Sequence, residues 1–351
     1  MKILSIGTGV IGTTYLWKFA EAGHDARVLV RAGKENSTRE SGILINYVDK
    51  RNRRRITGTE LFRPAVFTGG NIPDDNDLII VSVNSHQLDQ VLEMISTLNT
   101  GTVFILQNTW KCRETVNRYL SPDRFILGFP HMVGGANRGG EIDTIIFDDG
   151  HTRIESADSD HKKMLVEPVL ELLQTAGFKP KPTREIDNWI ISHHIQQASG
   201  IGLFLKYGGP EKVLADKARV REMILTAREG LRVCGKMGMR PLFISPINIL
   251  YLPLSILVPL FRKMFSAEDE MNMVRGHYEH GKYEMMHGWS EVLETGRKLN
   301  VKMSRWGSYQ EVIREAMVEN GEVADQEADQ DVDPVSGRVM MPGELLSAGK
   351  R

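Results

Sequence analysis

A glycine-rich hexapeptide directly after the first apolar stretch places the strongest constraint on the fold of this chain. Residues 2–6 have the apolar character of a buried strand, and residues 10–22 show helical spacing that ends at Gly23. Residues 26–31, ARVLVR, predict a second strand. A strand, a glycine-rich turn, a helix and a second strand within about 30 residues form a βαβ unit of the Rossmann type.

Each glycine of the hexapeptide has a physical role in such a unit. The first permits a tight turn, the second lets the backbone approach a pyrophosphate, and the third allows the helix to pack closely on the strand. The free N–H groups at the start of the helix favour phosphate. A turn that holds no ligand is the alternative. The pattern predicts a dinucleotide site made of Gly7, Thr8, Gly9, Val10, Ile11 and Gly12.

The end of the second strand indicates which dinucleotide binds. A site for NAD normally has Asp or Glu there, which accepts a hydrogen bond from the ribose. This chain has Arg31 instead, with Lys34 nearby and no acid before Glu35. Because a guanidinium suits a 2′-phosphate, we predict NADP(H) as the cofactor. The alternative is that Arg31 is only a surface residue.

Strand and helix patterns alternate after this unit and then change in character. Helical spacing dominates from about residue 185, over 188–207, 211–237 and 267–299. We therefore predict an α/β Rossmann-type doubly wound sheet followed by an all-helical C-terminal domain. The expected division is 1–182, 183–317 and an acidic, disordered tail over 318–351. The further strands are expected at 77–83, 102–108, 125–130, 142–147 and 152–155, with helices at 86–98 and 160–176.

Two segments of the first domain have unusual composition. Residues 42–48 (GILINYV) and 64–69 (PAVFTG) flank a polar stretch, which predicts a β-hairpin insertion. The basic run at its tip is expected to be solvated, with phosphate or nucleic acid as the alternative ligand. A glycine-rich loop is expected after residue 130, with Gly134, Gly135, Gly139 and Gly140. The basic run consists of Lys50, Arg51, Arg53, Arg54 and Arg55.

Composition excludes several other classes of function. The net charge of −1 gives no overall field for nucleic acid. Cys112 and Cys234 lack the spacing of a disulfide framework or a metal site, and a reducing cytoplasm fits them. Residues 241–261 carry no charge, but their four prolines favour short broken helices over a membrane span. We therefore expect neither nucleic acid nor a membrane as a partner, and we expect no bound metal. Attachment to a membrane through residues 242–261 is the alternative.

The chain resembles the ketopantoate reductase family over about residues 1–315. The resemblance rests on GTGVIG, Arg31, VSVNSHQLDQVL at 81–92, ILQN ending at Asn108, and GFP at 128–130. It implies a two-domain fold like that of 6-phosphogluconate dehydrogenase, NADP as cofactor, reduction of a small 2-oxo acid or related carbonyl, and a homodimer.

The family's functional residues are only partly present. The lysine that acts as general acid in a WxK context falls at Ile191, and a second family lysine falls at Asn84. The asparagine near the nicotinamide and substrate maps to Asn108. The substrate-binding glutamate maps to Glu284, in KYEMMHG. The resemblance thus implies cofactor contacts by Asn84 and Asn108, and substrate contacts by Asn108 and Glu284.

Reduction of a ketone requires a proton donor, and histidine is the most frequent choice. His193 and His194 lie where the family lysine is missing. Helix geometry favours His194 if the alignment has no gap, whereas a WxxxH pattern favours His193. A buried histidine bonded to backbone is the alternative for either, and His131 and His86 are weaker candidates.

The sequence therefore predicts an NADP(H)-dependent oxidoreductase for a 2-oxo acid or related carbonyl. The apolar segment 242–261 indicates a more hydrophobic pocket wall or an oligomer surface, and hence a substrate bulkier than ketopantoate. Two alternatives stay open. One is an opine-type or imine-reducing dehydrogenase, and the other is a regulator that binds NADP(H) without turnover.

Overall fold

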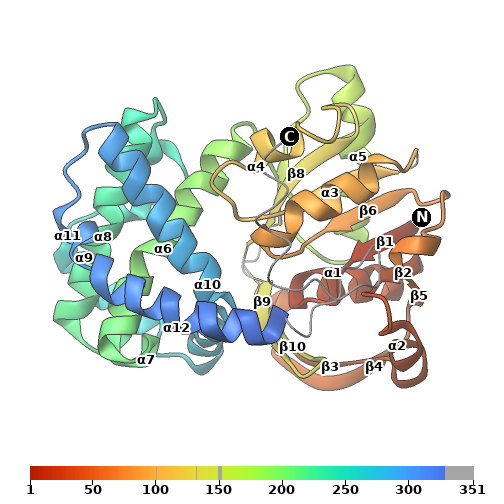
Figure 1. The fold of residues 1–351 in the computed structure, drawn as a ribbon, viewed down its shortest axis with the longest axis horizontal. Helices are drawn as coiled ribbons and strands as arrows, with labels where there is room; N and C mark the ends of the chain where they lie inside the picture. Colours follow the sequence, from red (N-terminus) through yellow and green to blue (C-terminus); the bar gives the residue numbers. More distant parts are fainter. Residues whose placement is uncertain (100, 132, 149–151, 329–351) are drawn as a thin grey trace.

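The computed structural model describes residues 1–99, 101–131, 133–148 and 152–328. An α/β part at the N-terminal end is followed by a helical part, and the two lie side by side (Figure 1). This arrangement confirms the fold class expected from the sequence.

An eight-stranded sheet forms the centre of the α/β part. Its order is β12-β11-β8-β7-β6-β1-β2-β5, and neighbouring strands pair in parallel except β8 with β11. In register, Ile3 of β1 lies opposite Leu78 of β6. The strands are β1 (Lys2–Ile6), β2 (Asp25–Leu29), β5 (Ala65–Phe67), β6 (Leu78–Val81), β7 (Thr102–Leu106), β8 (Phe125–Pro130), β11 (Thr152–Glu155) and β12 (Lys181–Thr183).

Both faces of this sheet are covered, which explains why its central strands are apolar throughout. Helices α1 (Val10–Glu21) and α5 (Asp160–Thr175) share one core cluster with the sheet. Helices α3 (Leu88–Ser96) and α4 (Cys112–Val116) share the cluster on the other face. The sheet is therefore doubly wound. Shorter elements are α2 (Glu35–Ser41), η1 (Arg51–Arg53), η2 (Gly69–Asn71) and η3 (Ser85–Gln87).

A second sheet of four strands has the order β4-β3-β10-β9. The expected hairpin is present, but its second strand is the polar stretch at 56–62, whereas the PAVFTG stretch forms β5 of the main sheet. β4 is a mostly exposed edge strand, so burial left no apolar pattern to detect. The strands are β3 (Ile43–Asp49), β4 (Ile56–Phe62), β9 (Val133–Arg138) and β10 (Glu141–Ile146).

The glycine-rich loop expected after residue 130 is instead strand β9 over its first part. Helix α10 (Glu268–Lys298) packs directly on this strand. A Cβ atom added at Gly276 of α10 would lie 2.5 Å from the carbonyl oxygen of Gly135. The glycines therefore allow a close approach of helix to strand, which composition alone does not distinguish from a loop.

The basic run is not a free solvated tip either. Lys50 Nζ lies 3.1 Å from Glu270 Oε1, and Arg55 Nε lies 3.0 Å from Asp269 Oδ2. Both acids belong to the first turn of α10, more than 200 residues away in the chain. The hairpin tip is thus paired with the helical part, a contact that no local pattern reveals.

The helical part begins with α6 (Ile186–Tyr207), which packs on α8 (Lys217–Lys236), α10 and α12 (Gln310–Ala328). The division at residues 182 and 183 stays a prediction. The acidic tail expected from residue 318 is helical as far as Ala328, because a helix that has started adds one hydrogen bond per residue. The rest of that tail, 329–351, lies outside the described residues. The other elements are α7 (Pro210–Leu214), η4 (Pro241–Phe243), η5 (Ile247–Tyr251), α9 (Leu254–Met264) and α11 (Ser304–Gly307).

The uncharged segment 241–261 forms short helices separated by prolines, as the sequence predicts. Among the described residues, no helix is both long and apolar enough to cross a membrane.

Candidate active site

The carboxyl ends of β1, β6, β7 and β8 meet at one edge of the main sheet, because these four strands run in parallel. Ligands of open α/β sheets bind at this edge. The glycine-rich turn follows β1 there, and Asn84, Asn108 and His131 follow the other three strands. Side chains from α6 and α10 contact the loops at this edge, since His194 bonds the carbonyl oxygen of Asn108 and Glu284 bonds the N–H of Ser85.

The glycine-rich turn has the backbone geometry that the sequence predicts. Gly7 has a φ of +88°, which favours glycine. A Cβ at Gly12 would lie 2.6 Å from the hydroxyl oxygens of Ser5 and Ser82, so this glycine lets α1 pack on β1 and β6. A Cβ at Gly9 would meet nothing within 4 Å. The turn thus leaves open space beside Gly9 and is tightly packed at Gly12.

The start of α1 supplies the polar groups of this turn. Gly9 is the N-cap residue, and no side chain caps the helix. The first N–H groups of a helix have no partner within the helix and attract anions. Asn137 Nδ2 of β9 donates to the carbonyl oxygen of Thr8 at 3.3 Å and so connects the turn to the second sheet. A dinucleotide pyrophosphate fits this open, uncapped turn.

Arg31 lies just beyond the end of β2, the strand next to β1. Its side chain is exposed, as is that of Lys34. The turn between β2 and α2 therefore presents two cations at the sheet edge that holds the glycine-rich turn.

Asn108 links the end of β7 to α6 through both its side chain and its backbone. Its Nδ2 donates to Gln197 Oε1, and its carbonyl oxygen accepts a hydrogen bond from His194 Nδ1 at 3.0 Å. Gln197 was not among the residues singled out from the sequence. Its position four residues after His193, on the same face of α6, is the signal that could have identified it.

His194 is buried between the β7 loop and α10. Its ring centroid lies 5.9 Å from that of Trp110, and a Cβ at Gly288 of α10 would lie 2.5 Å from its Nε2. Glu291 Oε2 lies 3.5 Å from the same nitrogen. Because a carbonyl only accepts, Nδ1 carries the proton that bonds Asn108. Nε2 faces α10, with the Glu291 carboxylate beside it.

His193 belongs to an aromatic stack at the end of β8. Its ring is nearly parallel to that of Trp189, with centroids 5.2 Å apart, and lies 4.3 Å from that of Phe129. His131 meets the edge of Trp189 at 5.6 Å. Burial, together with the neighbouring imidazoles of His131, His277 and His194, holds the pKa of His193 well below its ordinary value.

Helix α10 contributes His277 and Glu284, which are two turns apart and so lie on one face. Glu284 Oε1 accepts a hydrogen bond from the backbone N–H of Ser85 at 2.7 Å, beside Asn84. A Cβ at Gly134 would lie 3.2 Å from His277 Cε1. Burial of the imidazole against its neighbours lowers the pKa of His277. His86, in contrast, meets Tyr283 at 6.3 Å between ring centroids.

The sequence predicts Glu284 as a site residue, but it does not predict His277 or Trp189. The seven-residue spacing of His277 and Glu284 on one helix was the available signal for His277, and the WxxxH spacing was the signal for Trp189. No group of the described residues has the arrangement of a metal site.

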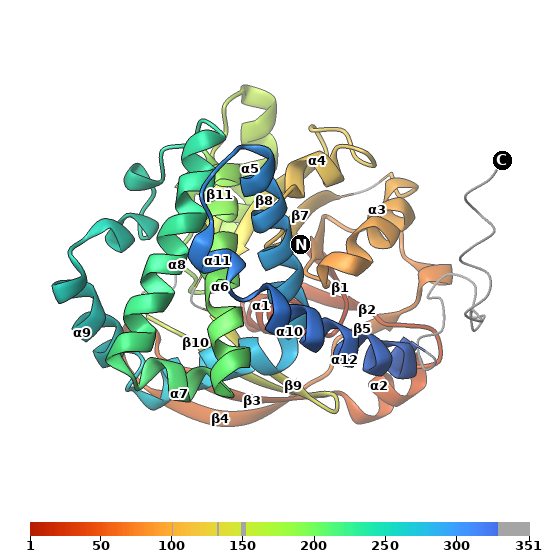
Figure 2. The ribbon, with the colours of Figure 1, turned by 60° about the vertical axis from the view of Figure 1, so that its left-hand side comes forward.

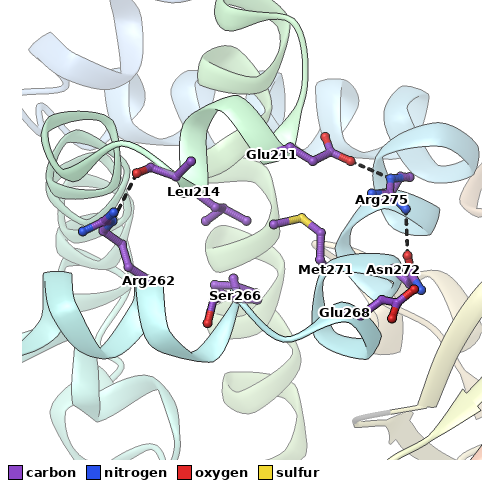
Figure 3. A pocket seen from close by; sticks show the side chains of 10 residues that line it. Glu211, Leu214, Arg262, Ser266, Glu268, Met271, Asn272 and Arg275 are labelled. Carbon is purple, nitrogen blue, oxygen red and sulfur yellow. Dashed lines mark hydrogen bonds and ion pairs between the residues drawn. The ribbon is translucent and has the colours of Figure 1, made fainter.

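A separate pocket of about 510 Å³ lies between α7, α9 and α10 (Figure 3). Two of its charged groups are paired with each other, since Arg275 bonds Glu211 at 2.5 Å, and Arg275 also bonds Asn272 at 2.7 Å. Arg262 donates to the carbonyl oxygen of Ala215 at 3.2 Å. None of its lining residues belongs to the cluster described above.

Comparisons with known proteins agree with this architecture. Residues 3–159 match the family model described as ketopantoate reductase PanE/ApbA. Among curated protein sequences, none matches the chain.

Solved structures share the fold over nearly the whole chain. D-mandelate dehydrogenase in complex with NADH is 13% identical, with a TM-score of 0.69 over 91% of this chain and 99% of that one. The 2-dehydropantoate 2-reductase from Geobacter metallireducens GS-15 is 16% identical, with a TM-score of 0.68 over 90% of this chain and 100% of that one. The enzyme of the same name from Methylococcus capsulatus is 18% identical, with a TM-score of 0.63 over 92% and 97%. Residues 3–159 thus resemble the ketopantoate reductase PanE/ApbA family, and the two parts of the chain together have the fold of the solved 2-dehydropantoate 2-reductases.

Proposed function

We propose that this protein is an NADP(H)-dependent reductase that converts a hydrophobic 2-oxo acid to the 2-hydroxy acid. One observation carries the proposal: an open dinucleotide turn and a cluster of imidazole, amide and carboxylate groups share one edge of the sheet. The family of residues 3–159 supports an oxidoreductase. The homodimer and the cytoplasmic location expected from the sequence stay predictions.

The cofactor would be held by the glycine-rich turn and by Arg31. The open space beside Gly9 and the uncapped start of α1 suit a pyrophosphate, and the guanidinium of Arg31 suits a 2′-phosphate. When bound, the cofactor supplies the hydride. Asn84 and Asn108, at the ends of the next strands, are the side chains we assign to its nicotinamide half.

Affinities for NADPH and NADH test the assignment of Arg31. We expect the protein to prefer NADPH, and Arg31→Ala to remove most of that preference, by about tenfold or more, with little effect on NADH. Arg54→Ala, at an exposed arginine of the β3–β4 turn, is the matched control. Equal affinity of the parent protein for both cofactors would contradict this assignment. One structural neighbour with this fold was solved with NADH.

We assign the proton donor to His193 rather than to His194. His194 Nδ1 is engaged by the Asn108 carbonyl, and its Nε2 is covered by Gly288 of α10. His193 lies one helical turn from Gln197, which bonds the Asn108 side chain, so the two residues share one face of α6. His194 then has a positioning role, because it fixes the carbonyl group of the residue that faces the cofactor and substrate.

The imidazoles of His131, His193 and His277 suit a substrate that carries a carboxylate. Burial and the neighbouring imidazoles disfavour the cationic form of His193, and a bound anion would offset that penalty. Substrate binding therefore raises the pKa of His193, which then protonates the oxygen of the carbonyl. Glu284, held by the N–H of Ser85, accepts a hydrogen bond from the hydroxyl that forms.

The pH dependence of turnover tests the donor. We expect kcat/KM, which reports the free enzyme, to fall with rising pH from a pKa below the ordinary value of histidine. The fall in kcat, which reports the complex, is expected at a higher pH. His193→Gln should lower kcat by about 10²–10⁴-fold and abolish the fall. A larger loss from His194→Gln than from His193→Gln would reverse the assignment.

The aromatic groups beside His193 favour a hydrophobic substrate. Trp189 and Phe129 form an apolar wall next to the proposed donor. One structural neighbour was solved with NADH and anilino(oxo)acetate, a ligand whose name describes an aromatic oxo acid derivative. We expect phenylpyruvate or 2-oxoisocaproate to be reduced faster than ketopantoate. Faster turnover of ketopantoate would contradict this, and a requirement for an amine would point to an imine-reducing dehydrogenase.

A further inference from the structure

The outward side of α9 exposes large apolar residues in a regular pattern. Ile256, Leu260 and Met264 are 53%, 45% and 41% exposed, at a spacing of four residues. Leu257 and Phe261, on a neighbouring side of the helix, are buried in the core. A helix with one buried and one exposed apolar side is not explained by the fold of the monomer.

The exposed surface continues into the segment before α9. Leu242, Phe243, Tyr251 and Leu252 are exposed there, Phe243 by 77%. Half of the large exposed apolar side chains among the described residues thus belong to this one stretch of chain. Figure 2 shows α9 at the outer edge of the helical part, on the side away from the eight-stranded sheet. We call the exposed residues of 242–264 the α9 surface.

The α9 surface is held in place from the inside. Arg228 Nε donates to the carbonyl oxygen of Leu250 at 2.6 Å, and Arg153 Nη2 and Trp189 Nε1 both donate to that of Ser245 at 2.9 Å. The backbone is therefore anchored to α8 and to the α/β part, while the apolar side chains point to solvent. These side chains are therefore exposed on a segment whose backbone is held in place.

The charge around the α9 surface has one sign. No Asp or Glu occurs between Glu229 and Glu268, although the whole chain has a net charge of only −1. The same stretch carries Arg232, Lys236, Arg240, Arg262 and Lys263. Lys236, Arg240 and Lys263 are exposed at the two ends of the apolar segment. An apolar face bordered by cations is typical of helices that lie in the interface of an anionic membrane.

We propose that the α9 surface binds an anionic phospholipid bilayer, with α9 lying in the plane of the headgroups. The apolar side chains would enter the boundary of headgroups and acyl chains, and the cations would pair with phosphate or carboxylate of the headgroups. Two copies of this chain that met through the same surface would bring cation against cation. Charge therefore favours lipid over a second copy. The sequence analysis kept membrane attachment through residues 242–261 as the alternative to its expectation of no membrane, and the proposal takes up that alternative.

Sedimentation with vesicles tests the proposal and needs no substrate. The full chain is mixed with vesicles of equal parts phosphatidylcholine and phosphatidylserine, or of phosphatidylcholine alone. We expect sedimentation with the anionic vesicles only, and less of it as salt rises. The double variant Ile256→Asp/Leu260→Asp should lower the bound fraction about tenfold or more. Lys236→Glu/Lys263→Glu should weaken binding and its dependence on salt.

Met164→Asp, at a residue of α5 that is 64% exposed, is the matched control and should bind like the parent protein. Circular dichroism and NADPH binding report whether each variant is folded. Absence of binding to anionic vesicles by the folded parent protein would overturn the proposal, as would equal binding to both vesicle types. A homodimer that Ile256→Asp/Leu260→Asp dissociates, seen by light scattering without vesicles, would assign the surface to a second copy instead.

Discussion

Replacement of Gly288 by alanine tests the role that packing gives to His194. The added Cβ would lie 2.5 Å from His194 Nε2 and 2.7 Å from Cε1, where ordinary contact begins at 3.4 Å. The ring would have to retreat by roughly 1 Å, toward the Asn108 carbonyl oxygen that it bonds at 3.0 Å. The substitution therefore compresses the contact between α10, α6 and the loop after β7.

Two opposed terms set the expected change in the free energy of unfolding. Overpacking costs about 1–3 kcal/mol, whereas alanine in place of glycine inside a helix gains up to about 1 kcal/mol. We expect Gly288→Ala to destabilise the parent protein by about 1 kcal/mol. In a His194→Ala background the ring is absent, so the same substitution should stabilise by up to about 1 kcal/mol.

Urea denaturation of the parent, the two single variants and the double variant measures this reversal of sign. Tryptophan fluorescence and circular dichroism should give the same transition if unfolding is two-state. We expect a coupling energy between the two sites of about 1–3 kcal/mol. Effects of Gly288→Ala that agree in both backgrounds within about 0.5 kcal/mol would refute the reasoning, because the clash with His194 would then carry no energy.

Three further predictions concern other parts of the molecule. Gly9→Ala should change the free energy of unfolding by no more than about 0.5 kcal/mol, since the added Cβ meets nothing within 4 Å and the φ of Gly9 is −70°. It should still weaken NADPH binding about tenfold or more, whereas the control Gly235→Ala, also in open space, should leave NADPH binding unchanged. Unchanged affinity of Gly9→Ala for NADPH would argue against a pyrophosphate at Gly9. Burial raises the pKa of the Cys112 and Cys234 thiols to about 12, so neither thiol should react with iodoacetamide at neutral pH until the protein unfolds. Rapid labelling of the native protein, detected by mass spectrometry, would contradict this prediction. The hydrogen bond from Arg55 lowers the pKa of Asp269, so the stabilising contribution of this carboxylate is present above the carboxyl pKa of the unfolded chain and is lost as pH falls through the lower folded value. Asp269→Asn should therefore lower the free energy of unfolding by about 1–2 kcal/mol at neutral pH and by little in acid. An equal loss at both pH values, measured by urea denaturation, would argue against a stabilising pair of Asp269 and Arg55.

Several features of the fold followed directly from local patterns. The strand, turn and helix at the N-terminus are specified by apolar periodicity and by glycines whose roles are local, such as the positive φ of Gly7. The buried strands β6 and β7 have continuous apolar sequences because both faces of the sheet are covered. The broken helices of 241–261 followed from proline, which acts on its own backbone and the preceding turn.

Other features depend on contacts between distant segments. Strand β4 is polar because it lies at an exposed edge, so its pairing with β3 left no apolar signal. The basic run at 50–55 finds its partners in the first turn of α10. A charge run carries no information on which distant element will approach it, so the expectation of a solvated tip holds for the exposed Arg53 and Arg54 but misses the pairing of Lys50 and Arg55.

The same division applies to the candidate site. Local patterns in the sequence predict the glycine-rich turn after β1 as a dinucleotide site, and they identify Arg31 and the two adjacent histidines as candidate site residues. The sequence could not decide between His193 and His194, because adjacent residues of a helix point in directions about 100° apart and the helix phase is set by packing. The surroundings of the two histidines are set by tertiary packing. Gly288 makes room for His194 under α10, and Trp189 and Phe129 hold His193 at the end of β8. The physical reason is that backbone conformation depends on neighbours in the chain, whereas the surroundings of a side chain are made by residues that can lie more than two hundred positions away.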